Sequence, residues 1–407
     1  MSTSSSYIPY KESELRVQNI RKKSLYSIKL DISGTHAELM NVLRRTMIND
    51  IPHVVLRCGW NLPGEDRCKL LVNRTQLDDQ LMRKRISQIP LIFDEKTMSN
   101  IQDIQCLELV LDVENNGNEM RIVTTDDMYI NEYASAESTE EPIRWDRHRT
   151  QSIFPSFVST RGGEVVPIHF IPLKPQIPSV NLPGEAIHFR VRLDIGTSKE
   201  HRNFGSVYTC TTFATPVPAD DPRYTKELSR KQKEWRKEGN FEQEGKAMES
   251  YLKEREKNWK NHDAQRITIP HTYTLNMSVI PTRTCFSFVT KACQLVVDRL
   301  NLVLKRTVDE VYPIQSVPHA TNGMCIWRLV QEDVGFGNML SKHIFAQFYP
   351  NELSFCTCSK THDHGVVLFI ARKDESHCTQ TWTIETIIEP TIRRIQEIFQ
   401  KIHSTLE

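Results

Sequence analysis

The chain has 407 residues, 39% hydrophobic and 25% charged, which is long enough for two or three globular domains with buried cores. Its 52 Lys and Arg against 51 Asp and Glu give a net charge of +1, which argues against a surface built mainly to neutralise a nucleic-acid backbone. Ten scattered cysteines form neither repeated CxxC pairs nor a disulfide scaffold, which favours a reducing compartment. We expect no signal peptide and no membrane-spanning segment.

The N-terminal part predicts a strand, a helix and a second strand after a polar leader, residues 1–23. Ser27–Ile32 alternates apolar and polar residues, which is the period of a half-buried strand. Residues 39–47 place apolar side chains at helical spacing, and Pro52 ends this helix because proline cannot donate a backbone hydrogen bond. His53–Arg57 again has the composition of a strand.

The middle of the chain, residues 58–190, is less regular. Leu107–Val113 and Met120–Thr124 have strand-like composition, and the Asn115–Gly117 turn between them predicts a β-hairpin. Pro167–Pro183 contains enough prolines to exclude a helix.

A segment rich in charges of both signs covers residues 220–263. Mixed charge of this kind is typical of one or two solvated helices, and Gly239 marks a break between them. The sequence leaves open whether its aromatic residues Trp235, Tyr251 and Trp259 dock a partner.

The C-terminal part predicts alternating strands and helices. Strands are expected at Thr272–Ile280, Cys325–Val330 and Gly365–Ala371, and helices at Phe286–Leu304, Phe336–Phe345 and Thr383–Ile402. The last helix gathers its isoleucines on one face and is strongly amphipathic.

A short internal repeat links the two ends of the chain. Leu39–Leu43 and Phe336–Leu340 share an asparagine and apolar positions at one constant offset, although a match of this length can be fortuitous. Each copy follows a strand, and each half closes with a long amphipathic helix, so we expect two modules that cover each other's apolar faces. The residues expected to pair the modules are Leu39, Leu43, Met47, Phe336, Leu340, Ile388, Ile392, Ile395 and Phe399.

Three segments resemble motifs of the α-like RNA polymerase subunits. Glu38–Met47, followed by Ile51-Pro52, resembles the leading helix motif of the bacterial α subunit, the archaeal D subunit and the third-largest eukaryotic subunit. Asn73–Leu91 resembles that family's second motif, an Asn-Thr-Ser-type turn before an acidic residue, a basic helix and an Ile-Pro-Leu ending. Gly196–Phe204 is similar to the Lys-Glu-His-Ala-Lys-Trp segment of the archaeal and eukaryotic members.

A fourth segment resembles the smaller partner of those subunits. Residues 332–340 are similar to the Glu-Asp-His-Thr-Leu-Gly-Asn-Leu-Leu motif of the archaeal L subunit and the eleventh eukaryotic subunit, with Val334-Gly335 in place of the His-Thr pair. His362 falls where that family has a Pro-His-Pro turn. The middle region lacks the four-cysteine cluster that many members carry, so no metal or other cofactor is carried over.

The resemblance implies an α+β fold with two α-like dimerisation modules that pair within one chain as a pseudo-heterodimer. It also implies a mostly β insert domain in the first module and a separate charged helical insertion. The expected boundaries are 1–23 for the leader, 24–92 and 265–308 for the first module, 93–215 for the insert domain, 216–264 for the helical insertion, 309–323 for a connector and 324–407 for the second module.

The resemblance further implies a non-catalytic assembly subunit of a DNA-directed RNA polymerase, a platform for the two largest catalytic subunits in transcription. Its partners would be those two subunits and smaller polymerase subunits. It would contact DNA and RNA only through the complex, and we expect it neither to bind a membrane nor to form a homo-oligomer. Fusion of the two subunits is a habit of nucleocytoplasmic large DNA viruses, which implies the virion and the host cytoplasm, with the nucleus also possible. The implied interface residues are Asn41, Arg44, Arg45, Asp78, Arg83, Arg85, Lys199, Glu200, His201, Glu332, Asp333 and Asn338.

Arg44 and Arg45 stand out among these residues. They lie between the apolar positions and the outer face of their helix, so at least one should be exposed and able to pair with another subunit's carboxylates or carbonyls. The alternative is a solvated pair without a partner.

A rival interpretation starts from a cluster of possible metal ligands. Cys356, Cys358, His362 and His364 have a C-x-C-x3-H-x-H spacing that could hold zinc, although structural zinc sites usually take two knuckles on separate turns. The corresponding function would be a zinc-dependent hydrolase or deaminase using Cys356, Cys358 and His364, with Glu352 as general base.

Overall fold

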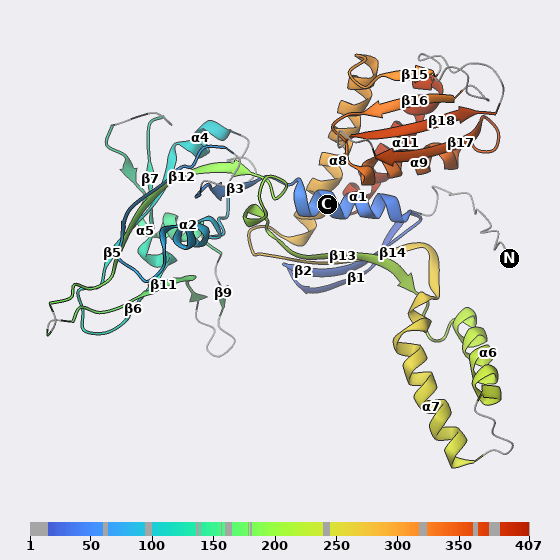
Figure 1. Cartoon of the computed structure of the whole chain (residues 1–407), viewed down its shortest axis with the longest axis horizontal. Coiled ribbons are helices and arrows are strands. Elements are labelled where there is room, and N and C mark those ends of the chain that lie inside the picture. Colours follow the sequence, from blue (N-terminus) through green and yellow to red (C-terminus); the bar gives the residue numbers. More distant parts are fainter. Residues whose placement is uncertain are drawn as a thin grey trace.

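The computed structural model describes residues 15–59, 64–93, 100–135, 138, 140–155, 157–158, 165–177, 179, 181–238, 245–316, 324–360, 365–373 and 383–406. The fold is α+β, and its strands pair in antiparallel sheets that lie in separate parts of the molecule (Figure 1). Among the described residues, no helix is long and apolar enough to cross a membrane.

The first module is a four-stranded sheet with two helices on one face. Its strands β1 (Arg16–Ser24), β2 (Ser27–Ser33), β13 (Val207–Pro216) and β14 (Thr268–Val279) follow the order β1-β2-β14-β13, and its helices are α1 (Ala37–Asn49) and α8 (Cys285–Val308). On β2, Ile28, Leu30 and Ile32 are at most 1% exposed and face the helices. The alternation of apolar and polar residues along β2 therefore determines which face of the sheet the two helices cover.

The second module repeats this arrangement. Its strands β15 (Ile314–Ser316), β16 (Met324–Leu329), β17 (Leu353–Lys360) and β18 (Val366–Arg372) follow the order β15-β16-β18-β17. Its helices are α9 (Val334–Phe348) and α11 (Glu389–Leu406), the latter preceded by the π-helical turn η6 (Thr383–Ile388). Two strands, a helix, two strands and a helix thus occur in both modules with the same sheet order. Asn41 and Asn338 are each the fifth residue of the equivalent helices α1 and α9.

The two modules share one hydrophobic core. Helix α8 packs against α11, and α1 packs against both α8 and α9. The residues expected to pair the modules are all at most 2% exposed and belong to this core: Leu39, Leu43, Met47, Phe336, Leu340, Ile388, Ile392, Ile395 and Phe399. Neither module could keep these side chains from water without the other.

The insert domain has its own core and lies to one side of the modules (Figure 1). Its main sheet contains β3 (His53–Leu56), β4 (Cys68–Asn73), β5 (Leu107–Glu114), β7 (Tyr129–Glu132), β8 (Ile143–Arg144) and β12 (Ala186–Gly196). Two small sheets pair β6 (Arg121–Thr124) with β11 (His169–Leu173) and β9 (Phe157–Val158) with β10 (Val165–Val166). The helices are α2 (Asp79–Ser87), α4 (Ile101–Gln105) and α5 (Arg147–Ser152).

The predicted domain boundaries at 92 and 215 do not match these sheets. Strands β3 and β4 pair with β12, so residues from about 53 onward belong to the insert domain rather than to the first module. Strand β13 was expected in the insert domain, but it pairs with β14 in the first module. The domain to which a strand belongs is decided by the strand it pairs with. The composition of a segment carries little information about which distant strand that is.

The predicted hairpin of Leu107–Val113 with Met120–Thr124 is wrong. β5 pairs with β12 and β7, whereas β6 pairs with β11. The turn between them is held by Asn115, whose side-chain amide donates to the carbonyl oxygens of Glu119 and Leu173 at 2.9 and 2.8 Å. These bonds direct the chain toward a second sheet instead of back along β5.

The charged insertion forms a helical arm, as predicted. Helices α6 (Pro222–Glu238) and α7 (Lys246–Asn261) project from the end of β13 and β14, followed by the short helix η5 (Asp263–Arg266) (Figure 1). The predicted break at Gly239 lies outside the described residues. Trp235 and Trp259, considered above for partner docking, are 7% and 4% exposed because they form the arm's own small core.

The shared core predicts that the modules stay together after the chain is cut between them. A protease site introduced between Ser316 and Met324 should give two fragments that co-purify, because the connection only raises the effective concentration of one module near the other. Size-exclusion chromatography after cleavage measures this. Two fragments that elute separately and remain folded would contradict the shared core.

Candidate functional site

Helix α1 positions the arginines that the sequence singled out. Its apolar residues face the shared core, which leaves Arg44 half-buried and Arg45 with 45% of its side chain exposed. The Arg44 guanidinium donates to the Asn41 side-chain oxygen at 2.9 Å, one turn earlier on the same helix. The Arg45 Nε lies 3.9 Å from an Asp333 carboxylate oxygen of the second module. The two arginines therefore serve different neighbours.

An ionic cluster joins the modules beside Arg45. Arg299 on α8 donates to Glu332 at 2.6 Å and to Asp333 at 3.1 Å, and its guanidinium lies 4.3 Å from the centre of the Phe336 ring. Asp333 also caps α9 by accepting the Phe336 N–H at 3.0 Å. Glu332 is 6% exposed, so it is not available to another subunit, contrary to the prediction. Its carboxylate is used inside the chain instead.

The charges of this cluster follow from burial and pairing. Burial opposes ionisation of Asp333, but the Phe336 N–H and the Arg299 guanidinium outweigh it and lower the pKa of Asp333. Burial raises the pKa of Asp50, at the end of α1, and Arg299 only partly offsets that effect. Burial alone would lower the pKa of Arg299, yet the Glu332 and Asp333 carboxylates raise it above the usual value. Arg299 is therefore the cation that holds the cluster together.

Two glycines allow α9 to lie close to its neighbours. A Cβ on Gly335 would lie 3.0 Å from the Asp333 carboxylate and 3.3 Å from the Asn41 side-chain nitrogen, so this position sets the distance between α9 and α1. A Cβ on Gly337 would overlap the side chains of Val366 and Cys358. Close helix packing explains both glycines.

The residues of the second motif mainly organise the insert domain. Asp78 caps α2 by accepting the Leu81 N–H at 2.8 Å. Arg83 donates to Asp66 at 2.6 Å, and the guanidinium of Arg85 donates to the Phe170 carbonyl oxygen. Asp78 and Arg85 are also exposed, so both remain candidates for an external contact.

The third motif ties the insert domain to α1. The Lys199 N–H donates to the Asn49 carbonyl oxygen at 2.9 Å, and Glu200 accepts from Arg57 at 2.7 Å. His201 accepts the Asn203 N–H at 3.3 Å through its Nδ1 atom, which caps the short helix η4 (Arg202–Phe204). Of the predicted residues, Lys199 and Glu200 are exposed and His201 is half-buried.

Sequence reasoning missed the buried partners of that motif. Arg57 donates to Asp194 at 2.6 Å as well as to Glu200, and both Arg57 and Asp194 are under 10% exposed. Hydrogen bonds from Gln105 and Arg57 outweigh burial and lower the pKa of Asp194. The only signal in the sequence would have been charged residues on otherwise apolar strands.

Two of the possible metal ligands, Cys356 and Cys358, lie on β17, a strand that the sequence did not predict. Burial raises the pKa of Cys356 to about 12 and that of Cys358 to about 11, and the Cys356 sulfur lies 3.8 Å from the Ser341 hydroxyl. His362 and His364 lie outside the described residues. Within the described part of the chain, no group of three or more His, Cys, Asp or Glu side chains could hold a metal ion.

Four further candidates, exposed or half-buried, lie at the junction of the two modules. Asn41, Arg44 and Arg45 lie on α1, and exposed Asn338 follows Gly335 by three residues on α9, which places it on the same face. We call these four residues the junction strip.

No family model matches the chain, and no curated protein matches it either.

Proposed function

We propose that this chain is a non-catalytic assembly subunit of a multisubunit DNA-directed RNA polymerase. The observation that carries the proposal is the duplication: two modules with the same order of strands and helices, and the same sheet order, share one core. The first and fourth of the motifs that resemble the α-like subunits lie on the equivalent helices α1 and α9, the third lies where the insert domain meets α1, and the second lies in the insert domain around α2.

In this proposal the junction strip is the contact surface for the second-largest subunit. Arg44 and Arg45 would donate to carboxylates or carbonyls there, because guanidinium groups make paired hydrogen bonds of defined geometry. The internal pairing of the modules would keep α1 and α9 side by side before any partner arrives, so less ordering is needed on assembly. A viral polymerase that acts in the virion and host cytoplasm fits the fused arrangement.

Reversing both arginines tests the proposal. The variant Arg44→Glu/Arg45→Glu leaves the apolar face of α1 untouched, so its free energy of unfolding should change by roughly 1 kcal/mol or less. At the partner surface the same change replaces donors by acceptors, where loss of one member of a buried charge pair costs about 2–5 kcal/mol. We expect a normal thermal melt and failure to co-purify with the second-largest subunit.

Two further variants make the test specific. Arg44→Glu alone changes the arginine that pairs within α1, so it should weaken capture without disturbing Asp333. Arg393→Glu/Lys401→Glu makes the same charge change on exposed positions of α11 and should capture the partner normally. Normal capture by a folded Arg44→Glu/Arg45→Glu variant would remove the junction strip from the interface.

A further inference from the structure

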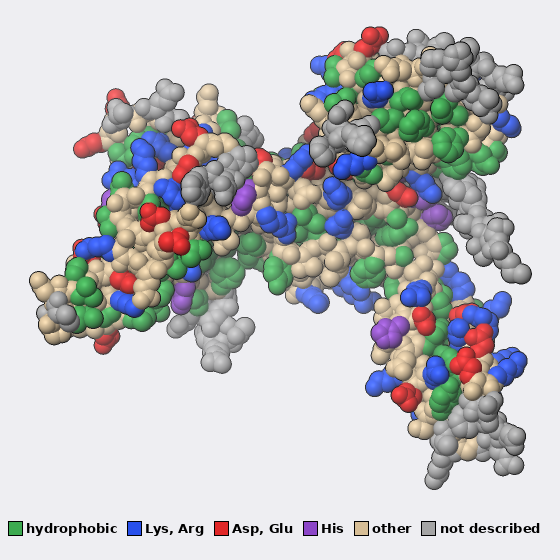
Figure 2. All heavy atoms as spheres, viewed as in Figure 1, with side chains coloured by type: hydrophobic (Ala, Val, Ile, Leu, Met, Phe, Trp, Pro, Cys, Tyr) green, Lys and Arg blue, Asp and Glu red, His purple; other side chains and the backbone are tan. Residues whose placement is uncertain are grey.

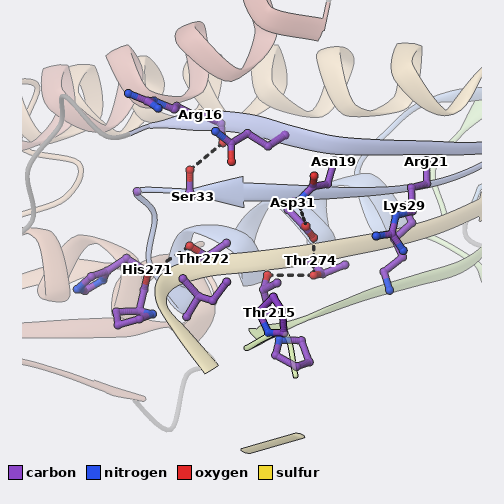
Figure 3. A pocket seen from close by; sticks show the side chains of 16 residues that line it. Arg16, Asn19, Arg21, Lys29, Asp31, Ser33, Thr215, His271, Thr272 and Thr274 are labelled. Atoms are coloured by element: carbon purple, nitrogen blue, oxygen red, sulfur yellow. Dashed lines mark hydrogen bonds between the residues drawn. The ribbon is translucent and has the colours of Figure 1, made fainter. Parts of the chain in front are cut away.

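A groove lies on the outer face of the first sheet, opposite α1 and α8. Because Ile28, Leu30 and Ile32 face the helices, the alternate residues Lys29 and Asp31 face outward into this groove. Its volume is about 740 Å³, which is within the range of ligand-binding clefts. Figure 3 shows side chains from β1, β2 and β14 surrounding the groove. None of the residues discussed for assembly lines it.

The groove contains a like-charge pair that the fold does not neutralise. Arg21 on β1 lies directly opposite Lys29 on β2 in the strand register, and both line the groove. Like charges at directly opposed positions of an antiparallel pair are destabilising. Lys29 lies over the Phe213 ring at 5.5 Å, and neither it nor Arg16 or Arg21 forms an ion pair within the described part of the chain.

The Asp31 carboxylate in the groove accepts its hydrogen bonds from neutral side chains. Asp31 accepts from the Thr274 hydroxyl at 2.6 Å and from the Asn19 amide at 2.9 Å, and Thr274 is within 3.0 Å of the Thr215 hydroxyl (Figure 3). It therefore does not pair with Arg21 or Lys29, so the net charge of the lining is positive. In Figure 2, Lys and Arg side chains gather along the margin of this sheet.

The backbone around the groove is unusual at two positions. Asn19 and His271 both line it, and each has a φ of 52°, which is uncommon for residues other than glycine. Asn19 lies where the register of β1 on β2 shifts between Gln18 and Arg21. Such irregularities re-aim side chains and concentrate at functional sites. Here the irregularity turns the Asn19 amide toward Asp31 and leaves Arg21 opposite Lys29.

We propose that this groove binds an extended acidic segment of a protein partner, in which carboxylates alternate with aliphatic side chains. Arg16 and Arg21 lie roughly 16 Å apart along β1 at ~3.3 Å per residue, too far for a single phosphate to bridge. An apolar wall of Pro216, Ile269 and Pro270 faces these cations. The described lining contains no Phe, Tyr or Trp, the side chains on which single-stranded nucleic acids stack. The proposal is independent of a role in polymerase assembly.

Fluorescence anisotropy of the full chain tests this binding. The probe is a fluorescein-labelled peptide of alternating Glu and Val, compared with the same peptide carrying Gln for Glu and with single-stranded and duplex DNA. We expect the Glu peptide to bind more tightly than the other three, and its affinity to fall as salt is raised from ~0.05 M to ~0.3 M. Tighter binding of either DNA, or equal binding of the Gln peptide, would overturn the proposal.

Charge reversal in the groove separates binding from stability. Arg21→Glu places opposite charges across from each other, so the melting temperature should stay equal or rise while peptide affinity falls about tenfold. Arg328→Glu makes the same change at an exposed position of β16, the equivalent of β2 in the second module, and should bind as wild type does. Unchanged peptide affinity in Arg21→Glu would exclude the groove as the binding site.

Discussion

Replacing Ile395 by aspartate is expected to unfold or aggregate both modules. Ile395 on α11 is 0% exposed in the apolar core that the modules share. An unpaired buried charge costs about 3–5 kcal/mol, which is a large share of the ~5–15 kcal/mol that holds a typical domain folded. Thermal melts followed by circular dichroism, with size-exclusion chromatography, measure the loss.

Two controls make that result interpretable. Ile143→Asp makes the identical substitution at a position that is 73% exposed, and Glu397→Lys changes the charge of α11 on its exposed face. Both should melt within about 1 kcal/mol of the wild type. If Ile395→Asp melted at the same temperature as Ile143→Asp, α11 would not belong to the core.

Replacing Arg299 by methionine is expected to cost about 3–5 kcal/mol at neutral pH. The methionine keeps much of the side-chain volume, but the largely buried Glu332 carboxylate and the capping Asp333 lose the guanidinium that neutralises them. Chemical denaturation at pH 7 gives the difference in unfolding free energy. The double variant Arg299→Met/Glu332→Gln should recover part of the loss, because it removes the uncompensated charge as well as the ion pair.

The same effect has a defined pH dependence. In the wild type the pKa of Asp333 is lowered, so its contribution to stability is present above its unfolded value of 3.8 and is lost as the pH falls through its folded value. Without Arg299, less offsets the burial of Asp333, so its carboxylate takes up a proton at higher pH than in the wild type. The difference between wild type and Arg299→Met should therefore shrink as the pH is lowered from 7 toward 4. A difference that grew on acidification would show that Arg299 does not act through these carboxylates.

Local patterns in the sequence were sufficient to predict most elements of the two modules. The alternation of apolar residues on β2 and their helical spacing on α1 and α11 each reflect one buried face. Burial of one face makes apolar residues recur at the period of the strand or helix, and this pattern is visible within a few residues. The prediction failed for β17, where Cys356 and Cys358 were considered as metal ligands and the strand was not recognised. Burial on this edge strand is incomplete, so its apolar alternation is weak.

Contacts between distant segments could not be predicted in the same way. Arg299 lies within a helical segment, and the sequence around it does not indicate which carboxylates it pairs with. Its partners Glu332 and Asp333 follow it by 33 and 34 residues. Arg57 and Asp194 are 137 residues apart and meet only because β3 pairs with β12. The motif resemblance selected Glu332 and Asp333 as important residues, yet their main contact is inside the chain. Such pairings depend on sheet topology, which the order of residues does not encode locally.

The place of the insert domain and the helical arm within the first module affects how the chain can fold during synthesis. β2 ends at Ser33, but its neighbour in the sheet, β14, begins only at Thr268. At ~5–20 residues per second, the roughly 230 residues between them take on the order of 10–50 s to translate. Throughout that interval the apolar face of the β1–β2 hairpin has neither β14 beside it nor α8 over it. The nascent chain is therefore expected to need chaperone protection at its N-terminal hairpin, while the insert domain, whose strands lie within residues 53–196, completes its own folding first.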